Sequence, residues 1–160
     1  ARYLGAAARR ARRVIGIDIS NGMLAEARKR LDDPRVTFVQ GGFNDAGIYP
    51  FAADLVFCVG VTRYIPPGRE VEFMQYLDRL MNFGGVAILT FVVRAENSIE
   101  AKIDILVESL LNKRGLSDRR FTLAQIQQMA GFGGFALEKI VDMPSPFLYT
   151  KKIVRMRKHA

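Results

Sequence analysis

Val14-Ile15-Gly16-Ile17-Asp18-Ile19 is the stretch that decides the fold of this chain. A short and nearly continuous apolar run is typical of a strand that is buried on both faces of a parallel sheet. The segment 21–31 that follows has the pattern of an amphipathic helix, and Ser20 is a suitable N-cap for it. The apolar stripe of this helix consists of Met23, Leu24, Ala27 and Leu31. Asp18 is therefore expected at the carboxyl end of a parallel strand, where open α/β sheets bind their ligands.

An acidic side chain at this position has a specific chemical use. The carboxylate of Asp18 can accept hydrogen bonds from the two vicinal hydroxyl groups of a ribose. The alternative interpretation is that Asp18 caps the following helix or is simply solvated. The pattern of the rest of the chain has to distinguish between these two interpretations.

The length and composition indicate one globular domain. The chain has 160 residues, 49% of them hydrophobic, which is enough to build a core. No apolar run approaches the ~20 residues that a membrane span requires, and no secretory signal precedes the first strand. Cys58 is the single cysteine and His159 the single histidine, which argues against an internal disulfide and against a structural zinc site. We therefore expect a cytoplasmic protein without a metal.

The net charge is +8, and the basic residues form two clusters. The first consists of Arg9, Arg10, Arg12 and Arg13, and the second of Lys151, Lys152, Arg155, Arg157 and Lys158. A basic surface can attract nucleic acid, an acidic membrane or an anionic substrate. The alternative is that these side chains are ordinary solvated ones, since no aromatic residues are interleaved with the N-terminal arginines.

Strands and helices alternate in the first half of the chain. Residues 1–13 have the composition of the end of a helix. Apolar runs predict strands at 14–19, 36–40, 53–59 and 86–92, and apolar stripes predict helices at 21–31 and about 68–82. Phe83-Gly84-Gly85 is expected to end the second of these helices. The alternation predicts parallel strands joined by right-handed crossovers, with helices on both faces of the sheet.

The second half has a different pattern. An amphipathic helix is predicted at about 97–113, and Thr122 and Gln125 form a capping box for a short helix that ends at Ala130, before Gly131. Residues 135–141 and 147–156 are predicted strands, antiparallel because a short loop joins them. The expected fold class is α/β: a Rossmann-like, mostly parallel sheet with helices on both faces and an antiparallel C-terminal hairpin.

Four short motifs occur in a fixed order along this chain. They are residues 16–20, residues 51–56, residues 80–85, and residues 121–135 with the hairpin that follows. In this order they resemble the second-strand motif, the fourth-strand motif, the helix-to-fifth-strand turn and the C-terminal end of class I S-adenosylmethionine-dependent methyltransferases. The resemblance covers nearly the whole chain and implies this activity.

One part of the family pattern is absent. Residues 1–13 resemble the helix that follows the family's first strand and its glycine-rich turn, but neither of those is present before it. The resemblance therefore implies that residues 1–160 are a single methyltransferase domain, truncated at its N-terminus. In the family the missing strand lies in the middle of the sheet, so the strands at 14–19 and 53–59 would each lack a backbone partner.

The resemblance implies which residues bind S-adenosylmethionine. Asp18 would bind the ribose hydroxyls, and Ile19 would pack on one face of the adenine, with Met23 in the same motif. Val59 and Gly60 would face the transferable methyl group through their backbone.

The residues after the second predicted strand would complete the adenine site. Phe43 would line the other side of the adenine, although it could equally be a core aromatic residue. The family often has an acidic residue near this point, where this chain has Gly42. Asn44 or Asp45 is the nearest polar substitute.

Methyl transfer is an in-line displacement at a sulfonium carbon, so the protein mainly aligns the acceptor and excludes water. Tyr64 is the first candidate for shaping the acceptor site, and Arg63 is a candidate anion clamp; both could also be ordinary loop residues. Cys58 is expected to be a small core residue.

The segment 96–121 resembles insertions that cover the acceptor, closest to those of enzymes that methylate porphyrin carboxylates or similar small metabolites. It could instead be a helix that packs on the sheet.

The expected partner is thus a small-molecule acceptor that offers a carboxylate or a hydroxyl. Three alternatives remain. A nicotinamide-dependent oxidoreductase is disfavoured by the antiparallel hairpin. A nucleic-acid methyltransferase or RNA-binding module is suggested by the charge. Enzymes that methylate amino groups of nucleic acids carry an asparagine- or aspartate-proline-aromatic motif after this strand, whereas this chain has Gly60-Val61-Thr62-Arg63 there. The third alternative is an inactive truncated fragment that binds the cofactor poorly.

Overall fold

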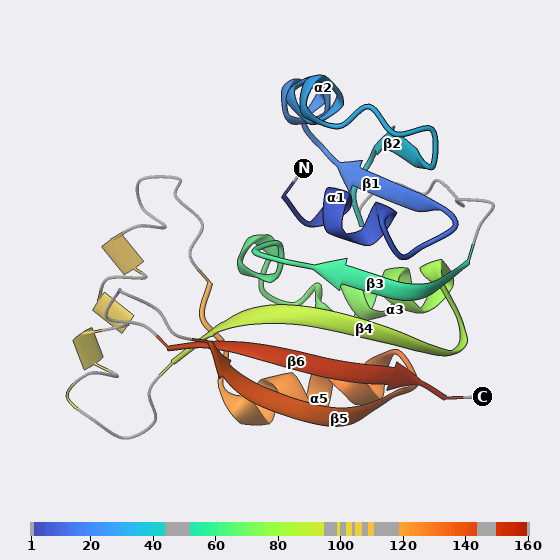
Figure 1. Ribbon diagram of the computed structural model, residues 1–160. Helices are drawn as coiled ribbons and strands as arrows, with labels where there is room; N and C mark the ends of the chain where they lie inside the picture. The colour runs from blue at the N-terminus through green and yellow to red at the C-terminus, as the bar shows by residue number, and fades with distance from the viewer. Residues whose placement is uncertain are drawn as a thin grey trace. The chain divides into compact units, whose positions relative to one another are not determined.

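The computed structural model describes residues 2–43, 52–94, 119–143 and 150–159, together with residues 99, 102, 103, 105, 106, 109 and 110. The chain divides into two compact units, Ala1–Ile48 and Tyr49–Ala160. The described strands form two separate hydrogen-bonded sheets, one in each unit (Figure 1). The assignment of residues 1–160 to a single domain stays a prediction.

The first unit is a two-stranded parallel sheet with two helices. Its elements are α1 (Arg2–Ala8), β1 (Val14–Asp18), α2 (Asn21–Arg30) and β2 (Val36–Gln40). Val14 pairs with Val36 and Asp18 with Gln40, so both strands end at the same edge. Both helices contact β1, and Leu24 and Ala27 are the buried residues of α2. The predicted strand-helix-strand order and the Ser20 N-cap are confirmed.

The second unit is a four-stranded mixed sheet in the order β3-β4-β6-β5. Its elements are β3 (Ala53–Cys58), the short 3-10 helix η1 (Thr62–Tyr64), α3 (Glu70–Leu80), β4 (Met81–Val93), α5 (Leu123–Phe132), β5 (Phe135–Met143) and β6 (Thr150–Lys158). β3 and β4 are parallel, whereas β6 is antiparallel to both β4 and β5. The predicted antiparallel hairpin is confirmed, and with it the α/β fold class.

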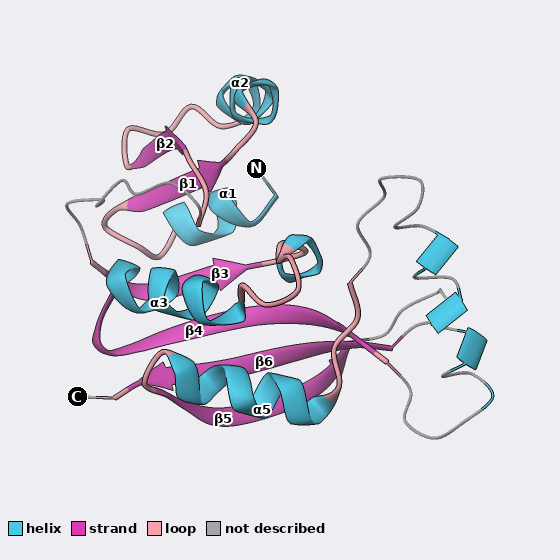
Figure 2. Ribbon diagram, turned by 180° about the vertical axis from the view of Figure 1, so that it is seen from behind, coloured by secondary structure: helices cyan, strands magenta, loops and turns pink. Residues whose placement is uncertain are grey.

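The core of this unit lies between the sheet and two helices. α3 and α5 contact each other and lie on the same side of the sheet (Figure 2). The buried side chains between them include Phe73, Met74, Leu77, Ile126, Met129, Leu89, Val154 and Met156. The apolar stripe of α3 is centred on Phe73, Met74 and Leu77, whereas Val71 is exposed.

The fourth strand begins earlier than its sequence predicts. β4 starts at Met81, directly after α3, and the pairing shifts between Ala53↔Met81 and Leu55↔Val86, so that extra residues of β4 bulge out opposite β3. Gly84 lies inside this irregularity with a φ of +73°, a conformation that residues with a Cβ rarely adopt. The expected turn at residues 83–85 is therefore a bulge within a strand rather than a loop before one.

One further boundary differs from expectation. α5 continues through Gly131 to Phe132 and ends at Gly133, so Gly131 does not break it. The Thr122–Gln125 capping box is present as predicted. The helix predicted at about 97–113 falls largely outside the described residues. Four of the apolar residues on which that prediction rests are described, and all four are exposed: Ile99, Ile103, Leu106 and Leu110.

Candidate functional site

The turn after β1 fixes the position of Asp18. Its Oδ1 accepts a hydrogen bond of 2.9 Å from the backbone N–H of Ser20, whose Oγ in turn accepts one of 3.3 Å from the N–H of Met23. The backbone carbonyl of Asp18 accepts from the N–H of Gly41 at 3.1 Å, just beyond β2. Both interpretations of Asp18 therefore have support, because it shapes the start of α2 and also stands at the carboxyl end of a parallel strand.

Two apolar side chains are exposed beside this carboxylate. Ile19 is 74% exposed and Met23 is 61% exposed, although both are large hydrophobic residues and Leu24, next to Met23, is buried. The backbone carbonyl of Ile19 is held by the side-chain amide of Gln40 at 3.2 Å. An exposed apolar surface next to a carboxylate fits a ligand that has a flat ring on one side and vicinal hydroxyls on the other.

The residues that follow β2 are placed at the same edge. Gly42 and Phe43 directly follow Gln40 and Gly41, and both are partly buried. Their position beyond the carboxyl end of β2 agrees with the prediction that they line the adenine site, and that role stays a prediction. Asn44 and its alternative Asp45 lie outside the described residues.

In the second unit, the equivalent edge is the end of β3. Val59 and Gly60 directly follow β3 and are exposed. Gly60 has a φ of +74°, and its N–H donates a 2.8 Å hydrogen bond to Oγ1 of Thr90. This positive φ favours glycine and turns the chain away from the strand direction immediately after β3.

Arg63 and Tyr64 lie in η1, directly after this turn. Tyr64 is 59% exposed, and the guanidinium carbon of Arg63 lies 5.7 Å from the centroid of its ring. The two catalytic candidates are thus neighbours, and the aromatic side chain of Tyr64 is exposed to solvent. An exposed phenol and a guanidinium can contact an anionic or aromatic acceptor.

The neighbouring Cys58 has no role in this chemistry. It is the last residue of β3, and burial raises the pKa of its thiol to about 12. Because the thiolate is the nucleophilic form, a buried thiol with this pKa is inert. The prediction that Cys58 is a core residue is confirmed by its burial.

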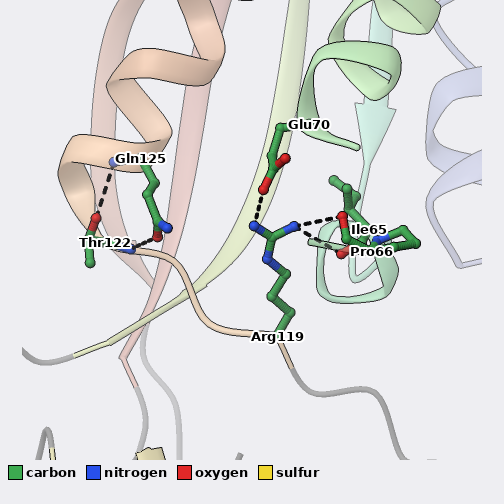
Figure 3. A network of polar contacts seen from close by, with 6 residues as sticks. All are labelled: Ile65, Pro66, Glu70, Arg119, Thr122 and Gln125. Atoms are coloured by element: carbon green, nitrogen blue, oxygen red, sulfur yellow. Dashed lines mark hydrogen bonds and ion pairs between the residues drawn. The ribbon is translucent and has the colours of Figure 1, made fainter. Parts of the chain in front are cut away.

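Three residues that the sequence patterns did not indicate support the loop after β3. Thr62 and Thr90 are buried polar residues, and Oγ1 of Thr62 donates a 2.6 Å hydrogen bond to the carbonyl of Thr90. Arg119 holds the end of the loop through the carbonyls of Ile65 and Pro66 (Figure 3). Thr90 could have been identified from the sequence, because a polar residue inside an apolar strand often has a specific hydrogen-bonding role. Nothing in the local sequence distinguishes Arg119 from its neighbour Arg120.

The C-terminal basic cluster is largely paired with carboxylates. Lys152 pairs with Asp142, Arg155 and Arg157 both pair with Glu138, and Lys158 pairs with Asp78. Glu138 has a lowered pKa, chiefly because the Arg157 side chain donates a hydrogen bond to it. These ion pairs favour the interpretation of the cluster as a structural surface of the sheet over a nucleic-acid contact.

A surface depression in the first unit lies away from these residues. It is lined by Arg28, Leu31, Asp32, Asp33, Val36, Thr37 and Phe38. The strand residues among them are the first three of β2, whereas Asp18 and Gln40 mark the carboxyl ends of the two strands. Ligands of parallel sheets bind at the carboxyl ends, so this depression is not the candidate site.

Within the described residues, no helix combines the length and the apolar character needed to cross a bilayer.

Comparisons with known proteins agree on one family. Residues 1–85, just over half of the chain, match the protein family described as a methyltransferase domain. A comparison with curated proteins found no match. Among solved structures, a magnesium protoporphyrin IX methyltransferase (ChlM) from Synechocystis PCC 6803 with bound SAH is 20% identical, with a TM-score of 0.71 over 94% of this chain and 66% of that one.

Two further structures give the same result. A SAM-dependent methyltransferase from Methanosarcina mazei is 12% identical, with a TM-score of 0.79 over 98% of this chain and 86% of that one. The pyocyanin biosynthetic protein PhzM is 20% identical, with a TM-score of 0.66 over 91% of this chain and 43% of that one. This chain thus spans less than two thirds of the length of ChlM and PhzM, and the likeness to all three is a likeness of fold.

Proposed function

This chain belongs to the methyltransferase domain family, and from that premise we propose that it is a class I enzyme that transfers the methyl group of S-adenosylmethionine to a small-molecule acceptor. The observation that carries the proposal is the edge formed by Asp18, Ile19 and Met23. A carboxylate fixed at the end of a parallel strand, next to two exposed apolar side chains, suits a ribose and its attached adenine.

The residues of the chain would then have separate tasks. Asp18 would accept hydrogen bonds from the ribose hydroxyls, while Ile19, Met23 and Phe43 would contact the adenine and exclude water from it. The cofactor supplies an electrophilic methyl group when it is bound. Val59 and Gly60 would border the reacting centre through their backbone.

We propose an acceptor with an oxygen nucleophile, either a carboxylate or a hydroxyl. A carboxylate is already deprotonated at neutral pH and needs no general base, which fits a loop whose candidate residues are Arg63 and Tyr64. The guanidinium of Arg63 would orient such an anion, and Tyr64 would contact its apolar part. Support comes from two proteins of similar fold that are named for small molecules, the magnesium protoporphyrin IX methyltransferase ChlM and the pyocyanin biosynthetic protein PhzM.

The cofactor proposal is tested by calorimetry with S-adenosylhomocysteine, using the protein that the complete gene encodes. Asp18→Ala should weaken binding by about 10- to 100-fold, the range expected when hydrogen bonds to a charged group are lost. Asp18→Asn keeps an oxygen that can accept from the N–H of Ser20, and so separates the ribose contact from the turn. Asp32→Asn, on the exposed turn before β2, is the matched control. Unchanged affinity in both Asp18 variants would contradict the ribose role.

The acceptor is tested separately by transfer of a labelled methyl group from S-adenosylmethionine. The panel consists of magnesium protoporphyrin IX, an aromatic carboxylic acid, a phenol and a structured RNA. We expect label on one of the small molecules. Label on the RNA alone would show that the nucleic-acid alternative is correct.

A further inference from the structure

The loop between β3 and α3 is fastened at its beginning by β4. The N–H of Gly60 donates to Oγ1 of Thr90 at 2.8 Å, and the hydroxyl of Thr62 donates to the carbonyl of Thr90 at 2.6 Å. Thr62 is 1% exposed, so its hydroxyl is removed from water and depends on this partner. One strand residue, Thr90, therefore fixes Gly60 and Thr62 at the beginning of the loop.

The end of the same loop is fastened by Arg119. One Nη of its guanidinium donates to the carbonyl of Ile65 at 3.1 Å and to that of Pro66 at 3.0 Å, and the other pairs with the carboxylate of Glu70 (Figure 3). The backbone N–H of Arg119 also donates to the carbonyl of Arg63 at 3.3 Å. A single residue thus contacts the loop at three carbonyls and the first turn of α3 at a fourth oxygen.

Arg119 is itself held in place. Its guanidinium carbon lies 4.6 Å from the centroid of the Phe121 ring, and Phe121 is fully buried. Phe121 is joined to the end of β4, because its N–H donates to the carbonyl of Val92 and its carbonyl accepts from the N–H of Arg94, both at 2.9 Å. The guanidinium is therefore attached to the sheet, and its side chain is only 12% exposed.

The chemistry of this contact depends on arginine. A guanidinium is planar, stays charged and offers several N–H donors in a fixed arrangement, so it can serve three oxygen acceptors at once. A lysine ammonium is a point charge and cannot reproduce the arrangement. Both ends of the loop are thus fixed, while the Tyr64 side chain between them remains exposed.

We propose that Arg119 is a positioning residue, which holds the loop carrying Arg63 and Tyr64 in the conformation that receives the methyl acceptor. This inference rests on the proposed function, in which Arg63 and Tyr64 contact the acceptor. It assigns no contact with substrate to Arg119 itself. Preorganising a binding loop lowers the cost of ordering it when the ligand arrives.

The first test measures the loop without any acceptor. In the protein that the complete gene encodes, Arg119→Lys should raise the hydrogen exchange of the amides of Tyr64 and Ile65 about tenfold or more, because the loop opens locally. Arg69→Lys is the matched control, since that side chain pairs with Glu72 near the start of the same helix. Unchanged exchange in Arg119→Lys, with the variant folded by circular dichroism, would overturn the inference.

The second test separates positioning from general stability. With the acceptor that gives the highest turnover in the panel above, Arg119→Lys should raise the KM for the acceptor about tenfold while the affinity for S-adenosylhomocysteine stays within twofold. Arg119→Ala should show the same split and regain part of its activity in millimolar guanidinium. An equal loss of cofactor affinity would overturn the inference. If the parent protein methylates no acceptor of the panel, the proposed acceptor class fails, and the exchange measurement still decides the role of Arg119.

Discussion

The hydroxyl of Thr62 donates a 2.6 Å hydrogen bond to the backbone carbonyl of Thr90, a residue 28 positions further along the chain. Thr62→Val keeps the shape of the side chain and removes the donor, which leaves a buried carbonyl with one partner fewer. We expect a loss of about 1–2 kcal/mol in the free energy of unfolding, measured by urea denaturation.

Thr37→Val serves as the control for that substitution. Thr37 is an exposed residue of β2, where a β-branched apolar side chain is well tolerated. Its free energy of unfolding should stay within about 0.5 kcal/mol of the parent value. Equal losses in the two variants would contradict a specific role for the Thr62 hydroxyl.

Two glycines at the end of α5 should respond in opposite ways to alanine. A Cβ at Gly133 would lie 2.7 Å from the Phe135 ring and 2.9 Å from the carbonyl of Met74, so Gly133→Ala should destabilise the chain by about 1–3 kcal/mol. A Cβ at Gly131 would have no atom within 4 Å outside its own helix. Gly131→Ala should therefore stabilise by about 0.5–1 kcal/mol. Thermal and urea denaturation of both variants check this, and a stabilised Gly133→Ala would contradict the packing.

The Glu70–Arg119 pair should make stability depend on pH. Partial burial raises the pKa of Glu70, but the hydrogen bond from Arg119, with backbone hydrogen bonds and the attraction of its charge, outweighs this and lowers the pKa below 4.5. A carboxylate with a lowered folded-state pKa stabilises the fold above its unfolded pKa and loses this contribution as the pH falls.

Glu70→Gln should accordingly be less stable than the parent by about 1 kcal/mol at pH 7, and the difference should shrink as the pH falls below 4.5. Urea denaturation between pH 3 and pH 7 measures the difference. Glu26→Gln is the control, because Glu26 belongs to an exposed ion pair with Lys29. A difference that is constant over this range would show that the charge of Glu70 is not the cause.

Cys58 should resist thiol reagents in the folded protein. It is the single cysteine and is buried, and a pKa of about 12 leaves almost no thiolate at pH 8. Ellman's reagent should therefore label less than one tenth of the protein within minutes, and all of it in concentrated urea. Rapid labelling of the native chain would contradict the burial of Cys58.

The sequence patterns were most reliable where one local rule decided the structure. The apolar run before Asp18, the Ser20 N-cap and the Thr122–Gln125 capping box are all present as predicted. The predictions were wrong at two glycines, because a glycine can end a helix, continue it or form a bulge in a strand. Gly131 continues a helix because its neighbours supply the packing, and Gly84 bulges within β4 instead of ending α3.

The candidate site shows the same division. Asp18 and Gly60 could be proposed from the sequence, because each follows the pattern of a parallel strand and ligands bind at the carboxyl ends of such strands. Arg119 could not, because its contacts with Ile65 and Pro66 span more than 50 residues and depend on tertiary structure alone. Long-range hydrogen bonds of this kind leave no periodic signal in a sequence.

β3 has consequences for handling the protein in solution. Among the described strands its one partner is β4, and Leu55 and Phe57 on it are exposed. An open strand edge that carries apolar side chains can template pairing with another chain and so promote aggregation. When residues 1–160 are prepared on their own they should therefore be kept dilute, and Leu55→Lys should improve the solubility of this segment, because it places a charge beside the edge and leaves the buried face of the sheet unchanged.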